Sequence, residues 1–118
     1  PRQEKGAVAR AFLRYESSTQ TLYFTIKFHE IKSKVTTIEF SDPSQSHSQT
    51  VFSHKVNHET EVDGTNQICS RWHKVPQNIL DKLAHGVIYL TLNSDENPLG
   101  EVKGVVKNHR VLLLGKAF

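Results

Sequence analysis

The sequence predicts an all-β fold, an antiparallel β-sandwich or barrel with Greek-key-like connectivity and one short helix near residues 76–84. Short segments alternate apolar and polar side chains with the period of a strand, and clusters of turn residues separate these segments. One segment has helical spacing instead. A chain of 118 residues is the size of one domain. We therefore expect a single domain over residues 1–118.

The first two strands are expected at residues 7–16 and 21–29, joined by the turn-like segment 17–20. In the second strand every other residue is large and apolar, which is the clearest strand pattern in the chain. The apolar faces consist of Ala7, Ala9, Ala11, Leu13 and Tyr15 in the first strand and of Leu22, Phe24, Ile26 and Phe28 in the second. We expect the two strands to form a hairpin.

A third strand is expected at residues 34–40, ended by the turn-favouring cluster at 41–44. Residues 50–56 fit a fourth strand. The polar segment 57–67 contains a tight-turn Asp-Gly pair and fits a loop or a weak edge hairpin. The third strand is expected to have one face formed by Thr36, Ile38 and Phe40.

The short helix is expected to begin at Pro76, because proline is tolerated in a first helical turn, and to end before Gly86. Its apolar residues at helical spacing are Ile79, Leu80 and Leu83. Two further strands and an apolar tail follow, at residues 87–92, 101–107 and 111–118. The tail is either a last strand or the start of a further element.

The net charge is +3 and the isoelectric point is about 9.1, with lysine and arginine scattered along the chain. This mild excess favours acidic partners only weakly and is equally typical of a solvated surface. No apolar run is long enough to cross a bilayer, so we expect no membrane span. The chain begins at Pro1 and contains no methionine, so we expect it to be cut from a longer multidomain protein.

Catalytic and metal sites are not expected. His47, His54 and His58 lie in one polar region, but their spacing suits a metal only if residues 54–58 are helical, which the strand prediction denies. Cys69 and His73 could be imagined as a thiolate and its base, yet a small buried or half-buried thiol is favoured. No nucleotide-binding, hydrolase or metalloprotease motif is present. We expect no enzyme and no cofactor.

Two groups of residues are candidates for binding a partner. The cluster Arg71, Trp72, His73 and Lys74 places an aromatic ring among cations, although strand alternation favours Trp72 in the core with charged neighbours outside. The second group consists of cations on strands that can adjoin, namely Arg10, Arg14, Lys27, Lys103, Lys107 and Arg110. Strands also carry lysine simply to blunt their edges. A nucleic acid is not the expected partner.

Four ordered segments resemble the CHRD, or chordin, domain family over about residues 6–110. Residues 68–76, ICSRWHKVP, look like the family's Cys-Gly-x-Trp-Arg-x-Val-Pro segment, with Ser70 in place of its glycine. Residues 6–11 and 37–42 are similar to two earlier strands of the family. The closing Pro-x-Gly-Glu signature is matched by Pro98, Gly100, Glu101 and Gly104. The likeness is greatest to the first CHRD domain of chordin and of its insect counterpart, short gastrulation.

The resemblance implies a secreted, extracellular and non-enzymatic module of a bone morphogenetic protein antagonist. In that family the neighbouring von Willebrand type C modules are credited with most of the growth-factor contact, so this domain is expected to act as a spacer and auxiliary binding surface. The alternative is binding of heparan sulfate or other matrix glycosaminoglycans through a basic sheet face. In a secreted chain, Cys69 could also pair with a cysteine outside residues 1–118.

Overall fold

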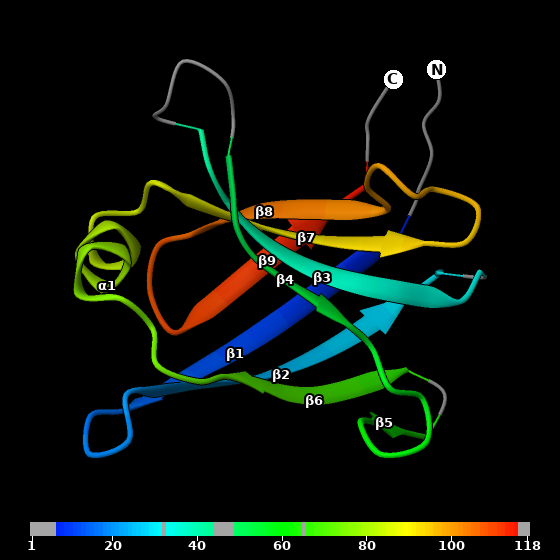
Figure 1. Cartoon of the computed structure of the whole chain (residues 1–118). Coiled ribbons are helices and arrows are strands. Elements are labelled where there is room, and N and C mark those ends of the chain that lie inside the picture. Colours follow the sequence, from blue (N-terminus) through cyan, green and yellow to red (C-terminus); the bar gives the residue numbers. More distant parts are fainter. Residues whose placement is uncertain (1–6, 32, 44–48, 65, 116–118) are drawn as a thin grey trace.

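A computed structural model describes residues 7–31, 33–43, 49–64 and 66–115. The expected all-β fold with one short helix is confirmed. Nine strands form one antiparallel sheet, with neighbours in the order β4-β3-β7-β8-β9-β1-β2-β6-β5, and the sheet curls into a half-barrel (Figure 1). The strands are β1 Val8–Glu16, β2 Thr21–His29, β3 Val35–Asp42, β4 Gln49–Lys55, β5 Val62–Asp63, β6 Gln67–Trp72, β7 Ile88–Ser94, β8 Val102–Val106 and β9 Arg110–Leu114.

The β1–β2 hairpin forms as its alternating pattern predicts. Its strands pair without a register break from Val8 opposite His29 to Glu16 opposite Thr21. Ala9 and Ala11 are buried, and so are all four apolar residues assigned to the inner face of β2. Ala7 and Leu13 are partly buried, and Tyr15, which lies near the hairpin turn, is 36% exposed.

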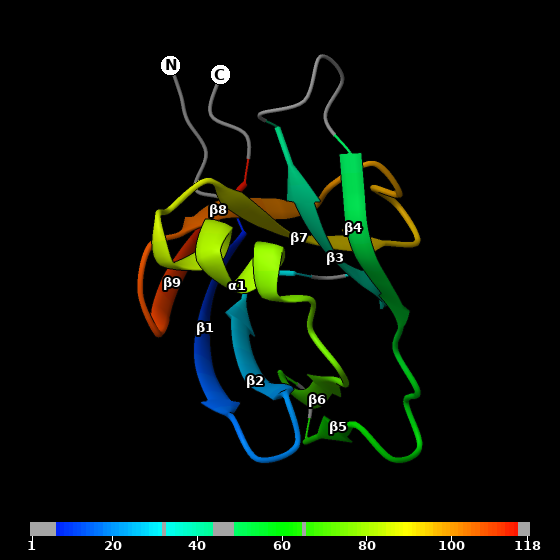
Figure 2. The same cartoon turned by 60° about the vertical axis from the view of Figure 1, so that its left-hand side comes forward.

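The concave side of the sheet encloses the core. Aromatic side chains from opposite arms of the sheet meet there, and Phe24 of β2 lies edge-on to Phe40 of β3 with ring centroids 5.6 Å apart. Helix α1 (Gln77–Ala84) lies at one end of the half-barrel, across the opening between the β1–β2 and β3–β4 arms (Figure 2). It buries Ile79 against this core. Gly86, at φ 73°, follows it and confirms the expected stop.

Strand β3 differs from its expected pattern in two ways. Its pairing with β7 shifts register between Val35 and Thr37, so Val35 and Ile38 are both buried although they stand three residues apart. The strand also continues to Asp42 instead of ending at Ser41. Asp42 is only 1% exposed because it forms an ion pair with Lys82 of α1, a long-range contact that turn propensity does not reveal.

The apolar tail forms strand β9, which lies between β8 and β1. Of the two alternatives for the tail, the last strand is therefore correct, and its side chains alternate, with Val111 and Leu113 buried. At its end the Gly115 backbone N–H donates to the Ala7 carbonyl at 3.0 Å. The two ends of the described fold therefore lie side by side. Within the described residues, no helix has the length and apolar character that a membrane crossing requires.

Candidate functional site

The outward face of β1, β2 and β6 brings together cations that are distant in sequence. Strand alternation buries Ala9 and Ala11 of β1 and leaves Arg10 and Arg14 exposed on the opposite side. The antiparallel register then places Arg10 opposite Lys27 of β2, which is also exposed. We call the outward side of these three strands the basic face.

An aromatic ring stands between two arginines on the basic face. Tyr23 of β2 pairs with Arg14 of β1 on one side and with Arg71 of β6 on the other. The Arg14 guanidinium lies over the Tyr23 ring, 4.5 Å from its centroid. Such a contact favours the charged form of the guanidinium and orients it, and among the described residues no carboxylate forms an ion pair with Arg14. Glu16 and Asp63 stand at the margins of this face.

The other predicted lysines lie elsewhere. Lys103 of β8 is exposed beside β9, where its ammonium lies 4.8 Å from the centroid of the Tyr89 ring. Lys107 follows β8 and lies close to Gly86, at the end of the helix. The expected single surface is therefore divided. The basic face lies on β1, β2 and β6, whereas Lys103 lies apart from it on β8 and Lys107 lies near the helix.

The cluster at 71–74 is divided between the core and the surface. Trp72 is 5% exposed and stacks on Phe52, as strand alternation favours. Arg71 and His73 are exposed on either side of it, and the His73 Nδ1 atom lies 3.3 Å from the Thr21 hydroxyl. Lys74 is exposed and has a φ of 56°. A partner at this surface would therefore meet Arg71, His73 and Lys74, and Trp72 would support them from below.

The thiol of Cys69 is free and exposed, which corrects the expectation of a buried or half-buried side chain. In β6 the inward positions are taken by Ile68 and Trp72, so Cys69 points outward beside Thr25. It does not approach His73 as a catalytic pair would, because the His73 ring contacts Thr21. The outward position leaves the thiol accessible to another cysteine.

A polar network joins β4 to β6 where the sheet has no hydrogen-bonded ladder. The His54 Nε2 atom lies 2.8 Å from both carboxylate oxygens of Glu61, and the Ser70 hydroxyl donates to Glu61 at 2.8 Å. Because a carboxylate only accepts, the Nε2 atom carries the donated proton. Ser70 Oγ also lies 3.1 Å from this Nε2, so serine and glutamate contact the same ring nitrogen. A catalytic triad needs serine and carboxylate on opposite ring nitrogens, so these three residues are not arranged as one.

Glu61 has a perturbed acidity in this network. Burial by itself would raise the pKa of Glu61, but hydrogen bonds from the Asn57 backbone N–H, from His54 and from Ser70 outweigh it. Attraction to the His54 ring adds to them, and the pKa of Glu61 lies below its ordinary value of 4.5. The carboxylate is thus held in its charged form as a link between β4 and β6.

Among the described histidines, His54 and His58 make separate contacts. The His58 ring contacts the Val35 carbonyl at 2.7 Å, away from the ring of His54 that bonds Glu61. In the part of the chain that the structure describes, no group of three or more His, Cys, Asp or Glu side chains suits a metal ion. His47 lies outside the described residues.

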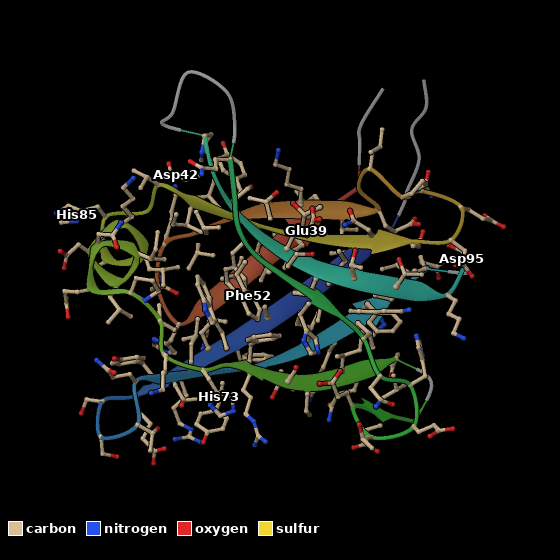
Figure 3. All side chains as sticks on the ribbon, in the orientation of Figure 1. Glu39, Asp42, Phe52, His73, His85 and Asp95 are labelled. Atoms are coloured by element: carbon tan, nitrogen blue, oxygen red, sulfur yellow. The ribbon has the colours of Figure 1, made fainter. Side chains whose placement is uncertain are left out.

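Sequence reasoning missed two parts of these surfaces. Tyr23 is central to the basic face, yet on its own strand it is only one outward residue among several. Its significance follows from the register with Arg14 and Arg71. Glu61 falls in the polar segment expected to be a loop or a weak edge hairpin, and no local signal indicates its contacts with His54 and Ser70. Figure 3 labels His73, just beyond the end of β6.

The residues of the Pro-x-Gly-Glu signature have structural roles. The Glu101 carboxylate accepts hydrogen bonds from Ser94 at 2.6 Å and from the Asn97 side chain at 2.8 Å, which closes the β7–β8 loop. At Gly104, an added Cβ would lie 2.1 Å from the Leu112 carbonyl oxygen. Only glycine allows β9 to approach β8 so closely.

A search of curated proteins and a search of solved structures each gave no match. A family model described as the CHRD domain matches residues 1–106. The match ends before β9, but β9 is a central strand of the sheet, so the folded unit extends to Leu114. Over most of its length the sequence fits this one family, and the chain belongs to the CHRD domain family.

Proposed function

We propose that this chain is a non-enzymatic extracellular module of a secreted, chordin-like antagonist of bone morphogenetic proteins, similar to the first CHRD domain of chordin and short gastrulation. The match to the CHRD family over residues 1–106 carries the proposal. In the complete protein, von Willebrand type C modules make the main growth-factor contact. This module serves as a spacer and as an auxiliary binding surface.

The position of the chain ends supports a particular kind of spacer. Ala7 and Gly115 are joined by a hydrogen bond, so a polypeptide continuing on both sides enters and leaves the module at one point. Such a module projects to one side of the polypeptide and adds little to the distance between the modules before and after it. Its exposed faces are then presented to a partner held by the neighbouring modules, at a raised effective concentration.

Binding of this domain alone to an immobilised bone morphogenetic protein dimer, measured by surface plasmon resonance, tests the proposal. We expect weak, reversible binding, because the contact is auxiliary. In the complete antagonist, replacing this domain by an inert domain of similar size should lower inhibitory potency. The contact function is wrong if the isolated domain does not bind and the replacement leaves potency unchanged.

A second proposed function is binding of a sulfated glycosaminoglycan such as heparan sulfate. The observation that favours it is the convergence of Arg10, Arg14, Lys27 and Arg71 on the basic face. The planar guanidinium group of arginine matches the geometry of sulfate oxygens, and cations spread over three adjacent strands can contact successive sulfates of a linear polyanion. Lys103 and Lys107 lie outside this group and would add little.

Elution from immobilised heparin in a salt gradient tests this second function. We expect Arg14→Ala with Arg71→Ala to lower the eluting salt concentration strongly, because both cations flank Tyr23. Lys34→Ala with Lys55→Ala removes the same charge from exposed positions away from the basic face and should have little effect. Equal shifts in the two variants, or elution by ordinary physiological salt, would rule it out.

A further inference from the structure

Exposed apolar side chains lie in the middle of the sheet, on its outward side. Strands β9 and β1 are neighbours in the interior of the strand order, away from either edge. Leu112 and Leu114 of β9 are 49% and 55% exposed, and Phe12 of β1 is 39% exposed. We call these three residues the outer stripe. A solvated sheet face normally carries polar residues at such positions, so grouped apolar residues indicate a contact surface.

Each residue of the outer stripe stands opposite a cation on the adjacent strand. Leu112 pairs with Arg10, and Phe12 pairs with Arg110. Leu114 pairs with Lys103 of β8. The apolar surface therefore meets Arg10 and Arg110, cations without an ion pair among the described residues, on its β1 side, while at the Leu114 end Lys103 shares a hollow with Glu39 and Glu101. A partner that covers it without burying unpaired cations must carry carboxylates around an apolar centre.

This composition distinguishes the outer stripe from a glycan site and from a self-association surface. A sulfated glycan would satisfy the cations but would gain little from Leu112 and Leu114. A two-fold dimer through the stripe would bring Arg10 and Arg110 of one copy against the same cations of the other. An apolar centre with arginine and an aromatic ring is instead typical of protein contact sites.

We infer that the outer stripe is the surface through which this module contacts its protein partner, and that the partner presents an apolar patch edged by carboxylates. The inference rests on the proposed function, since it locates the auxiliary growth-factor contact. It also distinguishes this contact from Tyr23 and Arg71, which lie on β2 and β6, away from β9. Arg14 follows Phe12 by two residues on β1 and borders both surfaces.

Binding of variants to the bone morphogenetic protein dimer tests the inference. Leu112→Ser with Leu114→Ser should weaken binding about tenfold or more, as expected when central apolar contacts are removed. The matched control is Tyr15→Ser, which removes a comparably exposed apolar side chain from the opposite face of β1. Arg10→Glu with Arg110→Glu should also weaken binding, whereas Lys34→Glu with Lys55→Glu should not. Thermal unfolding checks that each variant is folded.

The outcomes separate the inference from the proposed function. If the unaltered domain binds and the leucine variant binds equally well, the stripe is not the contact and the proposed function stands. If the unaltered domain does not bind the dimer, the proposed growth-factor contact and its assignment to the outer stripe are both wrong. Sedimentation of the domain alone provides a further check. A concentration-dependent dimer that the leucine variant abolishes would show that a second copy covers the stripe and would overturn the inference.

Discussion

The rings of Phe52 and Trp72 stack with centroids 4.5 Å apart and an angle of 13° between their planes. They come from β4 and β6, which are not hydrogen-bonded neighbours in the sheet. Phe52 projects from β4 toward the interior (Figure 3), where Phe40 also packs against Trp72 with centroids 5.3 Å apart. Side chains, and not a backbone ladder, therefore join the β4 and β6 arms of the half-barrel.

Truncating this contact should destabilise the fold. Phe52→Ala removes one side of the stack, and because Phe52 is only partly buried we expect a loss of about 2 kcal/mol in the free energy of unfolding. Urea unfolding followed by the fluorescence of Trp72, the single tryptophan, measures it. Phe12→Ala is the matched control, since Phe12 is 39% exposed on the outward face and should change stability far less.

The Glu61 network should make stability depend on pH in the acid range. The pKa of Glu61 is lower in the folded chain than its ordinary value of 4.5, so the unfolded chain binds more protons between the two values. The stabilisation is complete above pH 4.5 and is lost as the pH falls through the folded pKa. Glu61→Gln should reduce this dependence, and urea midpoints measured across acid pH would show it.

Glu59→Gln is the control for the pH experiment, because Glu59 is exposed in the same loop and its side chain does not enter the network. It should leave the acid dependence of the urea midpoint close to that of the unaltered chain. If Glu61→Gln also retains the full dependence, other carboxyl groups are responsible, and the link between Glu61 and acid stability is wrong.

Gly104→Ala should be poorly tolerated. The added methyl carbon would lie 2.1 Å from the backbone oxygen of Leu112, and a backbone atom cannot move aside as a flexible side chain can. We expect a loss of about 3 kcal/mol or a partly separated β8–β9 pair, measurable by urea unfolding and amide hydrogen exchange in β9. Gly64→Ala meets no atom within 4 Å and should cost less, despite its φ of 69°. Equal effects would contradict the close approach.

The ion pair between Lys82 and Asp42 should contribute to docking of α1. Asp42 lies at the end of β3 on the side of the molecule where α1 is found (Figure 3), and its side chain is 2% exposed. Lys82→Met keeps the aliphatic stem but deprives a buried carboxylate of its cation, which should cost about 2 kcal/mol in the free energy of unfolding. Gln77→Met, at an exposed position of the same helix, should have little effect in the same measurement.

Local pattern predicted the elements whose side chains alternate regularly. Residues close together in the sequence are enough to predict the β1 and β2 strands, the helix after Pro76 and its end at Gly86. The pattern failed at β3, where a register shift lets Val35 and Ile38 share the core. A bulge depends on how the strand pairs with its neighbour, so the sequence of one strand alone does not reveal it.

The candidate site was only partly predictable for the same reason. Alternation correctly separated the inward Trp72 from the outward Arg71. It could not place Tyr23 between Arg14 and Arg71, because that depends on which strands adjoin and in which register. Cys69 was misplaced as a buried thiol because a cysteine is apolar enough for either face.

By itself, the sequence determined the class of fold and the family, because strand alternation, turn residues and the Pro-x-Gly-Glu signature are properties of neighbouring residues. The tertiary structure alone decided where the last strand lies. By placing β9 between β8 and β1, it brought the exposed leucines Leu112 and Leu114 beside Arg10 and Lys103. Strand order and register arise because distant segments bury a shared core together, so the sequence of one segment does not determine them.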